Sequence, residues 1–192
     1  MDAARDPAAP IRTERLELVP YTAPMMRAVV DGDDPAAARL LGASLTIGLD
    51  DELREFFALR LPDLVADPAR LPWLARAIIL VGAADDRRVV GSVGFHGSPD
   101  DAGRVEIGYQ VEAGSRRRGI AIEAVRAMLD WAAAEHGIHR FRASIAPDNV
   151  ASLALAGRLG FVIVGRRTDD VEGEELVLER DDLTADSRDR VR

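Results

Sequence analysis

The chain has 192 residues, 47% of them hydrophobic, which is enough for one domain with a sizeable core but short for two independent domains. It contains no cysteine, which excludes disulfides, thiolate metal sites and a covalent cysteine nucleophile. The net charge of −8 argues against nucleic acid as a partner, because binding a phosphate backbone requires a basic field.

The first half of the chain predicts a strand, two helical stretches and then three strands. Apolar residues follow strand or helix periodicity in each segment. Turn-forming residues at 83–86 and 97–101 separate the last three strands, so we expect antiparallel hairpins there. The expected elements are a strand at Arg15–Tyr21, helical material at Pro24–Leu41 and Asp51–Val65, and strands near Ala77–Gly82, Arg88–Phe95 and Gly103–Val111.

After Val111 the periodicity becomes helical. Ile122, Val125 and Leu129 recur at helical spacing, and Gly137 supplies a stop. A strand at 141–145, a helix at 150–159 ending at Gly160, and strands at 161–166 and 174–178 complete the chain. The order predicts a mixed sheet with helices on its faces, in an α+β or α/β arrangement.

The two ends of the chain are polar and nearly free of large apolar groups. We therefore expect disordered tails at 1–10 and 184–192 around a single domain at 11–183. No stretch approaches the length of a membrane span, and the N-terminus lacks the apolar core of a signal peptide, so a cytoplasmic protein without a membrane partner is expected. The three histidines, His96, His136 and His139, are too scattered to suggest a metal site.

The segment Val111–Ala121 lies between an expected strand and an expected helix, and its sequence favours an anion site. The first N–H groups of a helix have no partner within the helix and lie at the positive end of its dipole. Gly119 allows close approach, and Ala121 intrudes little. The alternative is a solvated basic turn. The segment has neither the Walker pattern nor the three-glycine dinucleotide pattern.

Two motifs in this order resemble the GNAT acetyltransferases. Arg116-x-x-Gly119-x-Ala121 matches the family motif Gln/Arg-x-x-Gly-x-Gly/Ala, and Asn149-x-x-Ser152 followed by Leu159-Gly160-Phe161 resembles its next motif. The similarity extends over roughly residues 11–182. The opening Ile11–Leu18 and the strand sequence Glu106-Ile107-Gly108-Tyr109 look like the RimJ/RimL branch of that family.

The resemblance implies the GNAT acyl-CoA N-acyltransferase fold, a mostly antiparallel mixed sheet of about six to seven strands with helices on both faces. It also implies acetyl-CoA as cosubstrate and no metal. The backbone of Val111 and the side chain of Asn149 would hold the pantetheine arm. The pyrophosphate would be held by Arg116, Arg117, Arg118, Gly119, Ile120 and Ala121.

The expected catalytic residues are Glu106 and Ser152. An amine must lose a proton before it attacks a thioester, and strand alternation directs Glu106 to the face opposite Val105 and Ile107, where the resemblance places the substrate cleft. The alternative for Glu106 is an exposed carboxylate at the sheet edge. Ala156 stands where many members have a tyrosine acid, so another residue must supply the proton if an acid is used. Ser152 occupies the place proposed for the acid in this branch. The alternative for Ser152 is a small buried helix residue.

The resemblance thus implies direct transfer of an acetyl group to a primary amine, either a protein N-terminus or a small molecule. Dimers are frequent in the family, so the resemblance also implies a homodimer as one oligomeric state. Residues 24–73 would select the substrate, with Phe56, Phe57 and Trp73 as pocket walls, although helical spacing favours core positions for both phenylalanines. Two alternatives are a catalytically silent acyl-CoA sensor of this fold and an unrelated phosphate-binding module built on Arg116–Arg118.

Overall fold

The computed structural model describes residues 6, 8–45, 51–83, 86–169 and 173–182. The chain forms two compact units. The first contains the residues up to Gly94 together with Tyr109–Ala127, and the second contains Phe95–Gly108 and the residues from Met128 onward. The boundaries fall inside strands β5 (Arg87–Phe95) and β6 (Arg104–Val111) and helix α4 (Ile120–His136), so all three elements contribute residues to each unit.

The first unit is built on an antiparallel sheet. Its strands follow the order β1-β2-β4-β5, and the short β3 pairs in parallel with β5. The hydrogen bond from the Glu112 N–H to the Val90 carbonyl, 2.9 Å, joins the end of β6 to β5. The strands are β1 (Ile11–Arg12), β2 (Leu16–Pro20), β3 (Ser44–Leu45), β4 (Ala75–Val81) and β5 (Arg87–Phe95).

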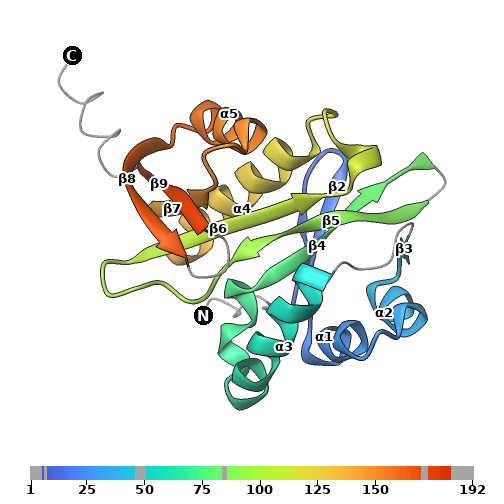
Figure 1. The fold of residues 1–192 in the computed structure, drawn as a ribbon. Helices are drawn as coiled ribbons and strands as arrows, with labels where there is room; N and C mark the ends of the chain where they lie inside the picture. Colours follow the sequence, from blue (N-terminus) through green and yellow to red (C-terminus); the bar gives the residue numbers. More distant parts are fainter. Residues whose placement is uncertain (1–5, 7, 46–50, 84–85, 170–172, 183–192) are drawn as a thin grey trace. The chain divides into compact units, whose positions relative to one another are not determined.

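Three helices of the first unit pack on one side of this sheet (Figure 1). The predicted helical material at 24–41 consists of two helices, because Gly32 has a left-handed φ of 72° and Asp33 starts a new helix. The Asp33 carboxylate accepts from the Ala36 N–H at 2.9 Å, an N-cap. The helices are α1 (Ala23–Val30), α2 (Asp34–Leu41) and α3 (Asp51–Ala66), and a 3-10 turn follows at Pro68–Trp73.

The core of the first unit lies between these helices and one face of the sheet. Alternation along β4 directs Ala77 and Ile79 to this face, where both are fully buried. Phe57 is also fully buried, and its ring centroid lies 4.7 Å from that of Tyr21 in an edge-to-face contact. Phe57 is therefore a core residue, as its helical spacing favours, rather than a pocket wall.

The second unit contains a mixed sheet in the order β6-β7-β9-β8. Strands β6 and β7 are parallel, as expected where a helix, here α4, makes the crossover between them. Strand β9 is antiparallel to both of its neighbours. The remaining elements are β7 (Arg140–Ile145), α5 (Val150–Arg158), β8 (Val162–Asp169) and β9 (Gly173–Asp181).

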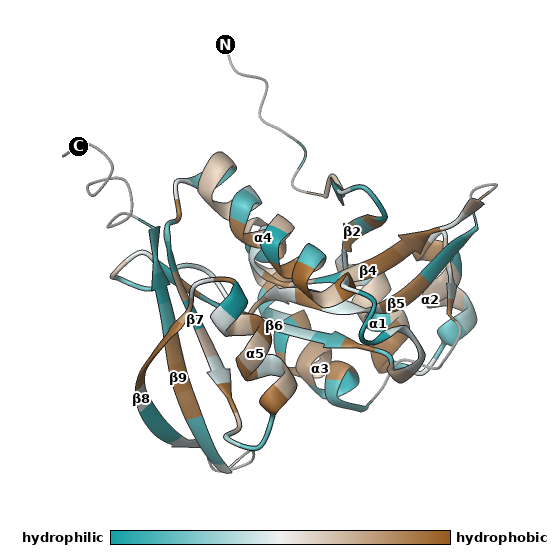
Figure 2. Cartoon of the chain, turned by 90° about the horizontal axis from the view of Figure 1, so that it is seen from above, coloured by the Kyte–Doolittle hydropathy of each residue, from teal (hydrophilic) through white to brown (hydrophobic). Residues whose placement is uncertain are grey.

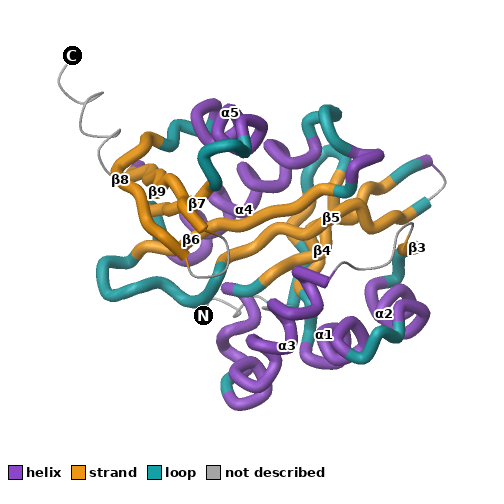
Figure 3. The backbone as a smooth tube through the Cα atoms, viewed as in Figure 1, coloured by secondary structure: helices purple, strands orange, loops and turns teal. Residues whose placement is uncertain are grey.

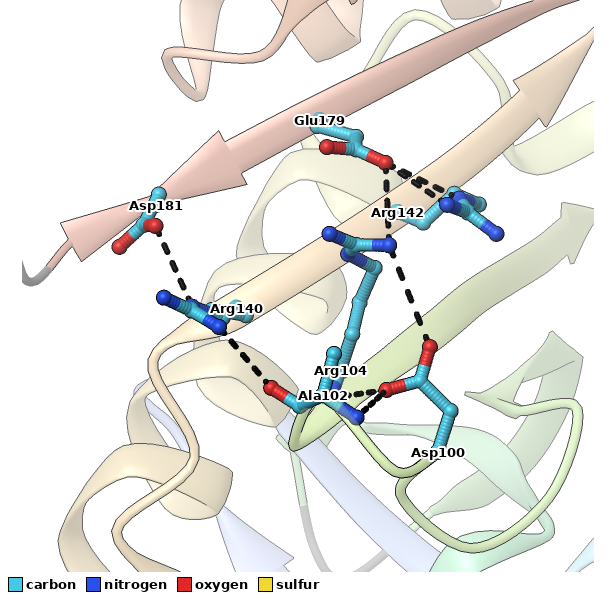
Figure 4. Close-up of polar contacts among 7 residues, drawn as sticks. All are labelled: Asp100, Ala102, Arg104, Arg140, Arg142, Glu179 and Asp181. Carbon is cyan, nitrogen blue, oxygen red and sulfur yellow. Dashed lines mark hydrogen bonds and ion pairs between the residues drawn. The ribbon is translucent and has the colours of Figure 1, made fainter.

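One face of the second sheet is charged. Cross-strand register places Arg142 of β7 opposite Glu179 of β9, and these side chains pair at 2.8 Å. The same Glu179 oxygen lies 3.3 Å from an Arg104 nitrogen, and Arg140 pairs with Asp181 at 3.3 Å (Figure 4). These ion pairs tie β6, β7 and β9 together, while most of the alternate residues of the same strands, such as Val105, Phe141 and Leu178, are apolar and buried.

Strand β8 forms the outer edge of the second sheet among the described strands. Its residues Val162, Ile163 and Val164 are 63%, 60% and 55% exposed, and they form an apolar run at the start of the strand (Figure 2). The pairing with β9 shifts register between Ile163 and Gly165, which is a β-bulge.

The mixed, mostly antiparallel α/β fold expected from the sequence is confirmed. Nine strands occur among the described residues rather than six or seven, and the two unpredicted ones, β1 and β3, have two residues each. The expected C-terminal tail and most of the expected N-terminal tail lie outside the described residues. No helix in the described part of the chain is long and apolar enough to cross a membrane.

Candidate functional site

The structure describes every residue of the loop between β6 and α4 (Figure 3). The Arg116 side chain turns back, and its Nε donates to the Val111 carbonyl at 2.8 Å. Arg117 and Gly119 have left-handed φ values of 60° and 78°. A left-handed arginine is uncommon, and such strained residues cluster at binding sites, so the loop is a candidate for function.

Helix α4 begins directly after this loop. Its first turn is closed by the Glu123 N–H, which donates to the Gly119 carbonyl at 3.2 Å. The amides of Ile120, Ala121 and Ile122 come before this bond and therefore lie outside the helical ladder, at the positive end of the dipole. This arrangement can hold an anion through backbone donors.

The predicted binding residues of the loop contribute in different ways. Arg117 and Arg118 are exposed, so their guanidinium groups can reach a bound anion from solvent. The Ile120 side chain is 2% exposed and belongs to the core, so only its backbone can take part. Val111 is buried as well, and its carbonyl is occupied by Arg116.

Arg15, which the sequence did not single out, lies immediately before β2 and braces the loop. Its Nε and Nη2 donate to one Glu123 carboxylate oxygen at 2.8 and 2.6 Å. Its Nη1 donates to the Arg118 carbonyl at 3.0 Å, and the Thr13 hydroxyl donates to the other Glu123 oxygen at 2.6 Å. The first turn of α4 and the loop before it are therefore held by one guanidinium group.

The electrostatics of Glu123 reflect this bracing. Burial raises the pKa of Glu123, but the hydrogen bonds from Thr13 and Arg15 together outweigh burial, and the net pKa lies below its usual value of 4.5. Glu123 is therefore held as a carboxylate, the form that accepts both donors.

Glu106 lies on β6 in the second unit, and strand alternation is as predicted, with Val105 and Ile107 buried on the opposite face. One Glu106 carboxylate oxygen is 3.3 Å from an Arg167 nitrogen and 3.9 Å from His96 Nδ1. That oxygen is buried and has no hydrogen-bond partner among the described residues. Arg167 in turn pairs with Glu175 at 2.7 Å.

Asn149 and Ser152 lie in the first turn of α5. The Asn149 side-chain oxygen accepts from the Ser152 N–H at 3.1 Å, so Asn149 caps the helix. The Asn149 side chain is exposed, and Ser152 is half-buried. Ala156, one turn further on, is 4% exposed and offers no proton.

The structure thus places the predicted residues in two groups. Val111 and Arg116–Ala121 form one continuous loop in the first unit, and Glu106, Asn149 and Ser152 belong to the second. The residues that the sequence did not reveal are Arg15, His96 and Arg167. No group of three His, Asp or Glu side chains able to hold a metal ion occurs in the described ranges.

A strand, an arginine-rich turn with a left-handed glycine, and a helix with open first amides define an α/β protein with a candidate anion-binding loop. The model of the acetyltransferase (GNAT) domain matches residues 15–162 of this chain. The chain therefore belongs to the GNAT acetyltransferase family, as its two motifs indicated.

A sequence relative is the uncharacterized N-acetyltransferase YjdG of Bacillus subtilis, 34% identical over 79 residues. The match covers 41% of this chain, and the chain spans about half the length of that relative, 47%.

Solved structures share the fold. The ribosomal L7/L12 alpha-N-protein acetyltransferase RimL, in complex with coenzyme A, has a TM-score of 0.60 at 19% identity, covering 90% of this chain and 97% of RimL. The microcin C7 self-immunity acetyltransferase MccE, in complex with acetyl-CoA and AMP, has a TM-score of 0.63 at 16% identity, covering 94% and 99%. The resemblance to the RimJ/RimL branch is thus confirmed at the level of fold.

Proposed function

We propose that this protein is an acetyl-CoA-dependent N-acetyltransferase that moves the acetyl group directly to a primary amine in a ternary complex. The observation that carries the proposal is the loop at Val111–Ala121, which presents the open amides of α4 beside exposed arginines. The chain has no cysteine, so the transfer cannot pass through an acyl-cysteine intermediate, in keeping with direct transfer.

In this proposal the pyrophosphate of acetyl-CoA binds to the amides at the start of α4, with Arg117 and Arg118 on its outer side. Bidentate arginine forks suit phosphate oxygens. The backbone of Val111 pairs with the pantetheine arm as an added strand would, and its N–H polarises the thioester carbonyl. Asn149 contacts the same arm in addition to capping α5.

Glu106 acts as the base. An amine such as that of lysine has a pKa of about 10.4, so it is protonated at neutral pH and must lose a proton before it attacks. The nitrogen lone pair then forms the C–N bond, the C–S bond breaks, and the thiolate takes a proton. Ser152 supplies that proton in the proposal, although a thiol with a pKa of about 8.5 leaves readily without strong help.

The acceptor is a protein N-terminus or a small-molecule amine. RimL, which shares the fold, is a ribosomal L7/L12 alpha-N-protein acetyltransferase, which supports a protein N-terminus as one of the two acceptor classes. We further propose that residues 11–183 act as one domain, since the chain passes between the two units three times, at 94–95, 108–109 and 127–128. We also propose that this domain is cytoplasmic. A homodimer remains a prediction.

A second candidate is a catalytically silent acyl-CoA sensor. It is favoured by Ala156, which is buried and stands where many family members carry the tyrosine acid. The sensor needs the loop and Asn149 but neither Glu106 nor Ser152.

The test measures thiol release from acetyl-CoA against polyamines, aminoglycosides, amino acids and N-terminal peptides. We expect turnover with at least one class and a fall of about 100-fold or more in Glu106→Gln, as for removal of a general base. Glu135→Gln, an exposed carboxylate on the last turn of α4, is the matched control and should keep full activity. Acetyl-CoA binding without turnover across the panel would favour the sensor, and absence of binding would refute both candidates.

A further inference from the structure

Gly108 is an unusual residue for the interior of a strand, because glycine lacks a side chain to pack and weakens strands. A glycine at such a position often marks the close approach of another group. The group here is His96, which follows β5. A Cβ added to Gly108 would lie 2.5 Å from His96 Nε2, closer than real Cβ contacts allow.

The backbone explains this placement. The His96 N–H donates to the Glu106 carbonyl at 2.9 Å, so the two residues are cross-strand partners with side chains on one face. The imidazole then extends diagonally over Gly108, two residues further along β6, as long side chains can in such pairs. Gly108 therefore makes the room that keeps the imidazole beside Glu106.

Polar groups from every strand of the second unit's sheet lie near this pair. Glu106 pairs with Arg167 of β8, which pairs with Glu175 of β9, and register places Arg142 of β7 opposite Glu106. Arg142 and the nearby Arg104 are both engaged by Glu179. The carboxylate oxygen that faces His96 also faces Arg167 and is buried, whereas the imidazole is 51% exposed.

We propose that His96 takes the proton that Glu106 removes from the amine substrate and passes it to solvent. This inference rests on the proposed function. The steps balance: the ammonium loses one proton to Glu106, Glu106 gives it to His96, and the imidazolium releases it to water. The free amine forms the C–N bond, the C–S bond breaks, the thiolate sulfur takes the proton of Ser152, and the second N–H proton of the amine restores the Ser152 hydroxyl.

The geometry suits this division of work. Glu106 is 18% exposed and pinned by Arg167, so a proton it accepts needs a route outward. His96 is the half-exposed neighbour, and imidazole is the side chain whose ordinary pKa, about 6.5, allows proton exchange near neutral pH. The 3.9 Å separation is longer than a direct hydrogen bond, so transfer requires a rotation of the imidazole or one bridging water.

The first measurement is an NMR titration of the imidazole protons. The chain has only three histidines, so His96→Gln assigns the signal. We expect Glu106→Gln to move the His96 titration midpoint to lower pH, because a neighbouring carboxylate favours imidazolium. An unchanged midpoint would overturn the pairing of the two groups, whether or not the wild type turns over any amine.

The second measurement is the pH dependence of kcat/KM. We expect His96→Gln to lower kcat/KM at pH 7 about tenfold, less than the ~100-fold minimum for a general base because Glu106 remains, and to remove the inflection that coincides with the His96 NMR titration. His136→Gln is the control, because the His136 ring centroid lies 4.6 Å from that of Trp131; this variant should leave the pH profile of kcat/KM unchanged. An unchanged profile in His96→Gln would overturn the relay.

Gly108→Ala provides an independent check. The atom it would displace is the far end of the flexible His96 side chain, so the variant should fold and move the imidazole. We expect it to reproduce the His96→Gln profile and to add nothing in the double variant. Additive losses would contradict the relay. Absence of turnover in the wild type would instead count against the proposed function, while the NMR titration still decides the pairing.

Discussion

Replacing Arg15 with glutamine tests whether the brace on the loop matters for acetyl-CoA. The change removes two hydrogen bonds to Glu123 and one to the Arg118 carbonyl. Buried charged hydrogen bonds contribute about 1.5–3 kcal/mol each, but the Arg15 side chain is 43% exposed, so solvent screening reduces the sum to about 1 kcal/mol. We expect the melting temperature to fall by about 2–4 °C.

The same loss, expressed at the loop, should raise the KM for acetyl-CoA about fivefold with little change in kcat. The informative comparison uses acetyl-pantetheine, which lacks the pyrophosphate, and the KM for this thioester should not rise in Arg15→Gln. Arg12→Gln is the matched control, because Arg12 pairs with Glu17 at 2.8 Å in the same hairpin and away from the loop. Equal effects of Arg15→Gln on both thioesters, or none on either, would refute the reasoning.

Three further predictions concern Glu123, two glycines with left-handed backbone, and Asn149. Glu123 has a lowered pKa in the folded protein, so its contribution to stability is present above its unfolded pKa of about 4.5 and is lost as the pH falls through the lower folded pKa. Arg15→Gln should therefore flatten the pH dependence of the unfolding free energy below pH 5. An unchanged slope would contradict this. Gly119→Ala and Gly137→Ala both force alanine into left-handed backbone at about 1–2 kcal/mol, so both should lower the melting temperature, yet only the former should raise the KM for acetyl-CoA. Asn149→Asp should keep the α5 cap and the unfolding free energy within about 0.5 kcal/mol while lowering kcat/KM, and full activity would argue that Asn149 is a cap alone.

Much of the fold could be predicted because local signals and packing agree. Gly137 and Gly160 end helices with left-handed φ values of 65° and 85°, as their positions in the sequence indicated. The alternation along β6 correctly separated Glu106 from its buried neighbours. The short strands β1 and β3 were missed because two residues carry no periodicity, and they are defined only by their pairing partners.

The loop and the Asn149 turn were found because each is a contiguous motif. Arg15 was not, because its partner Glu123 is 108 residues away and no local pattern links them. In the sequence His96 is one of three scattered histidines, and only the register of β5 against β6 brings it beside Glu106. Gly108 was the available signal, since a glycine inside a strand often marks the close approach of another group.

The apolar edge of β8 has a consequence for behaviour in solution. An exposed strand edge is a template for pairing with a second chain, and Val162–Val164 would suit such a contact. The bulge before Gly165 interrupts the regular spacing of backbone donors and acceptors, and two arginines, Arg166 and Arg167, follow at once. Deleting Val164 would straighten the edge, and light scattering should then detect concentration-dependent aggregation that the intact strand resists.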